Sequence, residues 1–284
     1  MKHKINEITY KPSLLNFIGK YILIFLKNNL SETNYNYISK QIHTLYKKIL
    51  RMKYLVFYFF KYLFISNLTR DKLYLTYKLL PFTMGGSYAL ENAYDLTNYV
   101  DRQKIEGCII ECGVAEGGTA AMMALVNKRS SQIQRNIYLF DSFEGLPEPS
   151  NEDFIGSNTG DFIRPLAKGD CYGSIDAVKN LFFNEIKIHE SKVKFIKGWF
   201  QDTIPKFRLK EKISILRLDG DWYESTKIPL QYFYSNVSNG GVVIIDDYAT
   251  CYGSRKAVDE FIIENHIDTE LIPDGRGGAW FKKV

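Results

Sequence analysis

The stretches LRLDGDWYEST (216–226) and GGVVIIDDY (240–248) decide the fold of this chain. In each, a run of β-forming residues is followed directly by aspartates. Such runs are typical of buried strands in a parallel α/β sheet, and the carboxyl ends of those strands line the ligand crevice. Two neighbouring strands of this kind would gather three or four carboxylates at one edge of the sheet.

A cluster of carboxylates at one place indicates a bound cation. Neighbouring negative charges repel one another unless a positive group lies between them. A hard divalent cation such as Mg2+ fits this position, because it takes oxygen ligands. The sequence therefore predicts a metal site in an enzyme.

Predicted strands and helices alternate from residue 81 onward. Strands are expected at 107–113, 136–141, 213–219 and 242–248, a strand and turn at 193–200, and a last strand pair near 268–283. Helices are expected at 117–128, 173–184, 225–237 and 254–264, the third of them capped by Ser225 or Thr226. This alternation favours a parallel α/β sheet. The segment 142–172 is too long for an ordinary connection between strand and helix.

Charge is distributed unevenly along the 284 residues, whose net charge is +5. Residues 1–80 hold 14 Lys and Arg against three acids, a net charge of +11, and residues 81–284 hold 23 against 29, a net charge of −6. The first region is rich in Tyr, Phe, Leu, Ile, Lys and Asn, and its periodicity predicts amphipathic helices. We therefore divide the chain into a basic helical extension, 1–80, and a second domain, 81–284.

Two interpretations of the basic extension are open. Its aromatic and basic side chains could contact a membrane, an anionic substrate or a partner chain. Alternatively, its helices could pack on the main domain or on a second copy, with the lysines in solvent. Its longest apolar runs, YILIFL (21–26) and YLVFYFF (54–60), are far shorter than a membrane span of about 20 residues. We expect no transmembrane helix.

The four cysteines show no metal-binding spacing. Cys108 and Cys112 fall on the same face of one predicted strand, so they cannot pair easily with each other. Free thiols are typical of a reducing compartment. No signal peptide is convincing at the start of the sequence, because Asn16 and Lys20 interrupt the apolar run there. We expect a cytoplasmic protein.

The turn after the first predicted strand, ECGVAEGGT (111–119), indicates a ligand pocket. Glycines there let the backbone approach a ligand, and the helix start offers free N–H groups. The spacing is not GxGxxG, which disfavours a nicotinamide-dependent dehydrogenase. An acid at the end of the second strand could accept hydrogen bonds from ribose hydroxyls. The predicted nucleoside pocket consists of Glu111, Gly113, Gly117 and Asp141.

Seven strings of residues 81–284 together carry a specific resemblance. They are PFTM (81–84), IIECGVAEGGTAAMMAL (109–125), LFDSFEGLPEP (139–149), VKFIKGWFQDTIP (193–205), LRLDGDWYEST (216–226), GGVVIIDDYATCYGSRKAVDEF (240–261) and GGAWFKK (277–283). In this order they resemble the macrocin O-methyltransferase family, which methylates sugar hydroxyls with S-adenosylmethionine. The resemblance implies a Rossmann-like class I methyltransferase fold, with a mostly parallel seven-stranded sheet and helices on both faces.

The same resemblance implies roles for individual residues. Mg2+ would be held by Asp219, Asp246 and Asp247, and the general base would be Asp219 or Asp221. By analogy with catechol methyltransferases, the metal would orient the acceptor hydroxyl and lower its pKa. The segment 142–172 would form a lid over the acceptor. Residues expected around the methyl donor are Thr83, Met84, Glu111, Gly113, Gly117, Asp141, Ser142 and Gly198.

The leading hypothesis is therefore an Mg2+-dependent O-methyltransferase acting on a sugar or glycoside hydroxyl. Composition and the basic extension favour a surface polysaccharide or its precursor as acceptor. A catechol-type O-methyltransferase and a non-catalytic, membrane-associated scaffold with a vestigial methyltransferase domain are the alternatives. We expect a homo-oligomer and, because no RNA-binding signature is present, no nucleic-acid partner.

Overall fold

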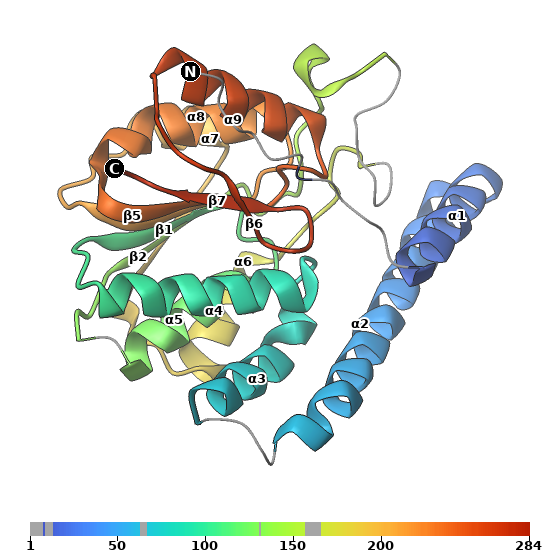
Figure 1. Cartoon of the computed structure of the whole chain (residues 1–284). Coiled ribbons are helices and arrows are strands. Elements are labelled where there is room, and N and C mark those ends of the chain that lie inside the picture. Colours follow the sequence, from blue (N-terminus) through green and yellow to red (C-terminus); the bar gives the residue numbers. More distant parts are fainter. Residues whose placement is uncertain (1–7, 9–13, 63–66, 131, 157–165) are drawn as a thin grey trace.

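The computed structural model describes residue 8 and residues 14–62, 67–130, 132–156 and 166–284 (Figure 1). Its centre is a seven-stranded sheet in the order β3-β2-β1-β4-β5-β7-β6. The first five strands of this order are parallel, and β7 runs antiparallel to both β5 and β6. The predicted Rossmann-like, mostly parallel sheet is confirmed.

The strands that carry the site lie in the middle of the sheet. β1 and β4 are buried along their whole length, as expected for central strands covered on both faces. The seven strands are β1 (Cys108–Cys112), β2 (Ile137–Asp141), β3 (Val193–Lys197), β4 (Ile213–Leu218), β5 (Val237–Ile245), β6 (Ile272–Pro273) and β7 (Ala279–Lys282).

Helices cover both faces of the sheet, as Figure 1 shows. Successive strand residues point to opposite faces, so Ile109 joins the apolar cluster under α4 and α5, and Ile110 joins the cluster under α8 and α9. The helices of residues 86–284 are α4 (Gly86–Arg102), α5 (Gly118–Ser130), α6 (Ile175–Asn180), α7 (Phe200–Thr203), α8 (Tyr223–Phe233) and α9 (Tyr252–Glu264).

The start of α8 differs from the prediction. The helix begins at Tyr223 with Trp222 in the N-cap position, so the prediction that Ser225 or Thr226 caps it is wrong. The reason is a tight turn in which the Trp222 N–H donates to the Gly220 carbonyl at 2.6 Å, which starts the helix early. Thr226 is instead buried and donates to Ser254 Oγ on α9 at 3.2 Å.

Three helices precede the sheet: α1 (Leu14–Asn29), α2 (Glu32–Tyr62) and α3 (Asn67–Leu79). In Figure 1, α3 lies beneath α4, whereas α1 and α2 stand at one side of the molecule. Leu75 and Leu79 of α3 belong to the apolar cluster under α4 and α5. None of the described helices is long and apolar enough to cross a membrane. The domain boundary at residue 80 stays a prediction.

Candidate active site

Backbone hydrogen bonds hold the carboxyl ends of four strands in one row. The Gly113 N–H donates to Phe140 O at 2.9 Å, the Asp219 N–H to Cys112 O at 2.8 Å, and the Asp246 N–H to Leu218 O at 2.9 Å. These bonds extend the pairing of β2, β1, β4 and β5 by one residue each. The residues that directly follow the strands therefore meet at one edge of the sheet.

Gly113, directly after β1, lies against the backbone of Asp219, directly after β4. It has a φ of +91°, and a Cβ at this position would overlap the carbonyl oxygen of Asp219. Only glycine fits here, because any side chain would push apart the strand ends that carry the site.

Replacing Gly113 by alanine is therefore expected to cost about 3 kcal/mol of unfolding free energy. The matched control is Gly169→Ala, which has a similar φ of +80° but open space around its Cβ. That control isolates the backbone strain of about 1–2 kcal/mol. Urea denaturation of both variants measures the difference, and equal losses would show that the close approach is unimportant.

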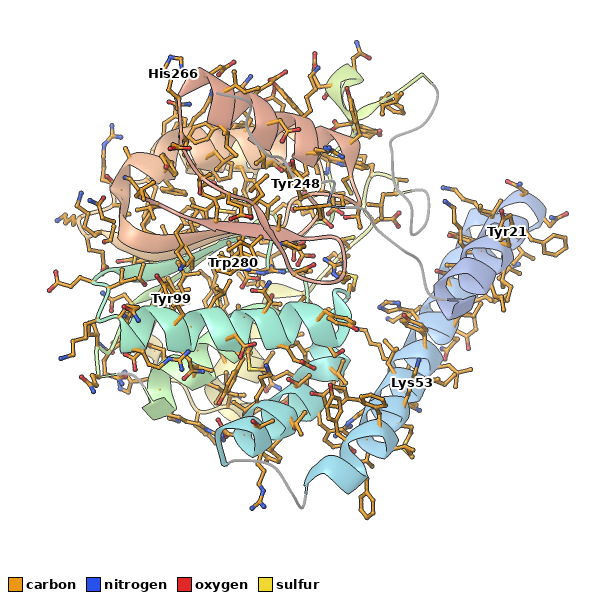
Figure 2. The ribbon with its side chains drawn as sticks, viewed as in Figure 1. Tyr21, Lys53, Tyr99, Tyr248, His266 and Trp280 are labelled. Atoms are coloured by element: carbon orange, nitrogen blue, oxygen red, sulfur yellow. The ribbon has the colours of Figure 1, made fainter. Side chains whose placement is uncertain are left out.

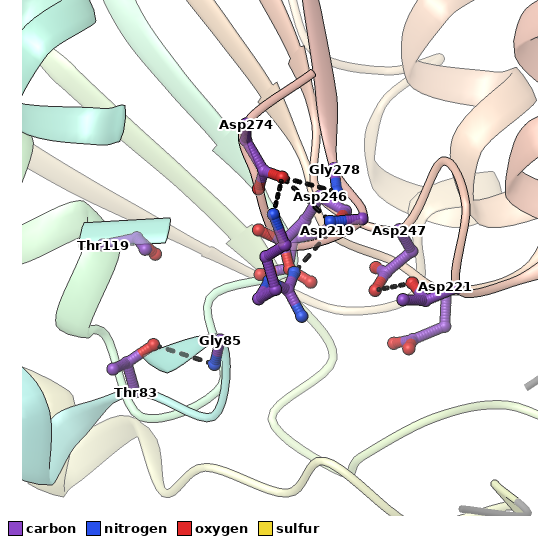
Figure 3. A network of polar contacts seen from close by, with 12 residues as sticks. Thr83, Gly85, Thr119, Asp219, Asp221, Asp246, Asp247, Asp274 and Gly278 are labelled. Carbon is purple, nitrogen blue, oxygen red and sulfur yellow. Dashed lines mark hydrogen bonds and ion pairs between the residues drawn. The ribbon is translucent and has the colours of Figure 1, made fainter. Parts of the chain in front are cut away.

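Three carboxylates predicted to bind a metal lie together at this edge (Figure 3). Oxygens of Asp219, Asp246 and Asp247 all lie within 4.8 Å of one another. A second group of Asp221, Asp247 and Cys251 meets the same limit, so Asp247 belongs to both groups. Asp221, Asp246 and Asp247 are buried.

Two arginines supply positive charge to this cluster, and the sequence analysis missed both. Arg217 Nη1 donates to Asp219 at 2.7 Å and to Glu111 at 2.6 Å, and Nη2 donates to Asp246 at 2.6 Å. Arg276 Nη2 donates to the Asp246 carboxylate and, at 3.0 Å, to the Asp246 carbonyl. A charged residue in the mostly apolar strand ISILRL could have pointed to Arg217 as a site residue. No pattern in the loop around Arg276 pointed to Arg276.

The arginines hold the pKa of Asp246 below its usual value but not that of Asp247. Burial by itself would raise the pKa of Asp246, but Arg276 and Arg217 overcome this effect and lower it. Burial raises the pKa of Asp247 well above its usual value, and the neighbouring Asp221 and Asp246 raise it further. Asp247 is thus the carboxylate whose charge the protein compensates least.

The carboxylate of Asp247 is a good candidate ligand for a cation. Oδ1 of Asp247 accepts a hydrogen bond from Thr250 Oγ1 at 3.0 Å, but the buried Oδ2 has no hydrogen-bond partner among the described residues. A buried charged oxygen without a partner is costly. Coordination of Mg2+ by this oxygen would remove the cost, so the residues present fit the predicted metal.

The acidic cluster opens onto a cavity of about 990 Å³. Its wall contains all four aspartates of the cluster together with much of the predicted donor site. In Figure 3, Thr83 and Thr119 lie across from Asp219 and Asp246. The predicted donor residues that line the cavity are Thr83, Met84, Gly113, Asp141 and Ser142.

Asp141 orders the loop between β1 and α5. Its Oδ2 accepts from the N–H groups of Val114 and Ala115 at 2.6 and 2.9 Å, and its Oδ1 accepts from the Phe143 N–H at 2.6 Å. An ionised carboxylate offers about four lone-pair sites. Two of these sites hold the loop at Val114 and Ala115 and a third holds Phe143, so about one site is left for a ribose hydroxyl.

Three predicted donor residues are absent from the described cavity wall: Glu111, Gly117 and Gly198. Glu111 is fully buried behind the wall, where it accepts from Thr119 Oγ1 at 2.6 Å and from Arg217. Burial raises the pKa of Glu111 to about 7, although Arg217 and Thr119 oppose the rise. A Cβ at Gly117 or Gly198 would crowd Val178 or Thr203. The structure therefore gives all three residues a role in packing or in positioning neighbours.

The helical extension closes the other side of the cavity, so its helices pack on the main domain, one of the two interpretations that the sequence left open. α2 contributes several aromatic side chains to the wall, among them Tyr46, Tyr54 and Phe57. Lys47 of the same helix donates to the Pro81 carbonyl at 3.0 Å and forms an ion pair with Glu116. α2 is thus part of the site rather than a separate appendage.

Comparison with known families gives a match over most of the chain. The profile described as Macrocin-O-methyltransferase (TylF) matches residues 65–283. Demethyldecarbamoylnovobiocin O-methyltransferase of Streptomyces niveus is 31% identical over 202 residues, which cover 71% of this chain and 76% of that protein. Mycinamicin III 3''-O-methyltransferase of Micromonospora griseorubida is 28% identical over 73% of this chain and 80% of its own length.

Solved structures of methyltransferases share the fold of this chain. The O-methyltransferase NovP superimposes with a TM-score of 0.63 at 34% identity and covers 72% of this chain and 82% of its own. The calicheamicin methyltransferase CalS11 superimposes with a TM-score of 0.58 over 83% of this chain and 91% of its own. At 19% identity, the second match supports the fold alone.

Proposed function

Because this chain belongs to the macrocin-O-methyltransferase family of S-adenosylmethionine-dependent enzymes, we propose that it methylates a hydroxyl of a sugar or glycoside. The observation that carries the proposal is one cavity lined both by predicted donor-binding residues such as Asp141 and by the aspartates after β4 and β5. Donor and acceptor must meet at such a place, since transfer requires the acceptor oxygen, the methyl carbon and the sulfur in line.

In the proposed reaction, the cofactors and the side chains of the cavity have separate chemical roles. When bound, S-adenosylmethionine supplies an electrophilic methyl carbon, and Mg2+ supplies a Lewis acid that lowers the pKa of a hydroxyl. Asp219, Asp246 and Asp247 are the proposed metal ligands. Asp219 or Asp221 is the proposed base, because both line the cavity and either carboxylate could take the acceptor proton.

The proposed acceptor is a surface polysaccharide or a precursor of it. The relatives named above act on demethyldecarbamoylnovobiocin and on mycinamicin III, as their names state. In this chain, the wall opposite the aspartates carries Tyr46, Tyr54 and Phe57 from a strongly basic helix. Aromatic faces suit the apolar faces of sugars, and the basic charge of the helix suits an anionic acceptor.

Calorimetric titration with S-adenosylmethionine tests the proposal. The wild-type chain is expected to bind this donor and not NAD. Asp141→Asn should weaken donor binding by about tenfold to a hundredfold, because loss of charge-assisted hydrogen bonds loosens the loop at Val114 and Ala115. The matched control is Asp268→Asn, which replaces an exposed aspartate.

Two results would contradict the proposal. A folded wild-type chain that binds no donor would support the alternative of a non-catalytic scaffold. Binding of NAD in place of the donor would support a dehydrogenase. If the donor binds, a screen of sugar and glycoside acceptors against catechols follows, and transfer to catechols alone would exclude the sugar acceptor.

A further inference from the structure

The outer face of α2 carries a continuous stripe of exposed apolar side chains. Its members are spaced by four and three residues in turn, so they lie above one another on one face of the helix. Each is more than 40% exposed. We call this set the outer stripe: Leu45, Ile49, Met52, Val56 and Phe59.

A second apolar face lies on α1. Ile18, Tyr21, Ile22 and Phe25 are exposed and also follow helical spacing. Tyr21 points away from the sheet domain in Figure 2. Of the 20 large apolar side chains that are exposed in the described residues, 12 lie on α1 and α2. This concentration distinguishes a patch from the scattered apolar residues of any protein surface.

The opposite face of α2 holds the helix in one orientation. Lys47 bonds the Pro81 carbonyl and Glu116, and Tyr54 Oη donates to Glu91 at 3.1 Å. The Arg51 guanidinium lies 4.2 Å from the centre of the Tyr77 ring. These contacts direct the outer stripe away from the sheet domain, so none of the described residues buries it.

The charge of the two helices indicates what the stripe contacts. Together α1 and α2 contain eight Lys and Arg but a single acid, Glu32. Lys48 and Lys53 border a shallow groove formed by Ile49, Met52 and Val56, and Phe57 lies between this groove and the cavity. Lysines beside an apolar face can extend their ammonium groups to lipid phosphates while their stems cover apolar surface.

We propose that the outer faces of α1 and α2 dock this protein on an anionic lipid surface. The apolar side chains would enter the interface between headgroups and acyl chains, and the lysines would bind the anionic headgroups. A second copy of the chain fits the same faces less well, because pairing them would bring two strongly basic helix pairs together. The docking is peripheral, since none of the described helices is both long and apolar enough to cross a membrane.

Docking would also place the cavity beside the membrane, since α2 lines the cavity with its other face. A glycan on a lipid carrier would reach the aspartates from this side. This consequence rests on the proposed function, whereas the docking itself does not.

Vesicle co-sedimentation tests the docking without donor or acceptor. The wild-type chain is expected to bind phosphatidylcholine vesicles that contain phosphatidylglycerol, and to bind pure phosphatidylcholine vesicles at least about tenfold more weakly. Ile49→Glu combined with Val56→Glu should reduce binding by about tenfold or more. Lys48→Gln combined with Lys53→Gln should reduce it to a similar degree, because both lysines are exposed and border the groove of the outer face.

The matched control is Tyr232→Glu combined with Ile263→Glu, which places the same charges on exposed apolar positions of α8 and α9. This control should bind vesicles like the wild type. Circular dichroism verifies that each variant is folded. The proposal is overturned if the folded wild type binds no anionic vesicles. It is also overturned if light scattering shows a dimer that Ile49→Glu with Val56→Glu dissociates, while neither form binds vesicles.

Discussion

The Asp247→Asn variant is expected to lose methyl transfer by about a thousandfold or more while still binding S-adenosylmethionine. Asp247 belongs to both acidic groups at the strand ends, and its buried Oδ2 has no hydrogen-bond partner in the described part of the chain. An amide at this position keeps the size of the side chain but removes the charge that would hold Mg2+. The methyl transfer rate at saturating Mg2+ and the donor affinity are the two measurements.

Stability distinguishes loss of the metal from loss of the fold. In EDTA, Asp247→Asn should be at least as stable as the wild type, because a buried, uncompensated carboxylate has been removed. Treatment of the wild type with EDTA should reproduce the loss of transfer, and added Mg2+ should restore it. The matched control, Asp268→Asn on the surface, should leave both quantities unchanged. Full transfer by Asp247→Asn in EDTA would exclude the metal mechanism.

The Arg217→Met variant is expected to lose about 3–5 kcal/mol of unfolding free energy in EDTA. The guanidinium is buried and bonds three carboxylates, those of Glu111, Asp219 and Asp246. Methionine fills a similar volume, but it leaves these acids without their shared counter-charge. Breaking a buried ion pair costs more than the pair contributes, because an uncompensated charge stays behind.

Two further variants make this prediction specific. Arg255→Met removes an arginine whose ion pair with Asp259 spans 3.6 Å and is partly exposed, so it should cost at most about 1 kcal/mol. Glu111→Gln added to Arg217→Met should restore part of the lost stability, since it removes one of the carboxylate charges that Arg217 no longer neutralises. Urea denaturation measures all four proteins. If Arg217→Met is as stable as the wild type, Arg217 does not balance the acids.

The family and the fold could be predicted from local patterns of the sequence, such as apolar runs that end in aspartates. The apolar runs before Asp219 and Asp246 predict buried strands, and β4 and β5 are those strands. Because parallel strands present their carboxyl ends at one edge, the meeting of these aspartates follows from the runs themselves. The start of α8 was predicted less well, since the turn at Gly220 begins the helix early.

The sequence by itself determined the sheet, the acidic strand ends and the family, because hydrophobic periodicity and strand-end residues are encoded over a few neighbouring positions. The tertiary structure alone decided which charges compensate one another. Arg217 reaches Asp246 across 29 residues, and Lys47 reaches Glu116 across 69. Such pairs depend on strand register and on helix placement, which place residues distant in sequence side by side. For the same reason, only the structure separated Glu111, behind the cavity wall, from Asp141, which lines it.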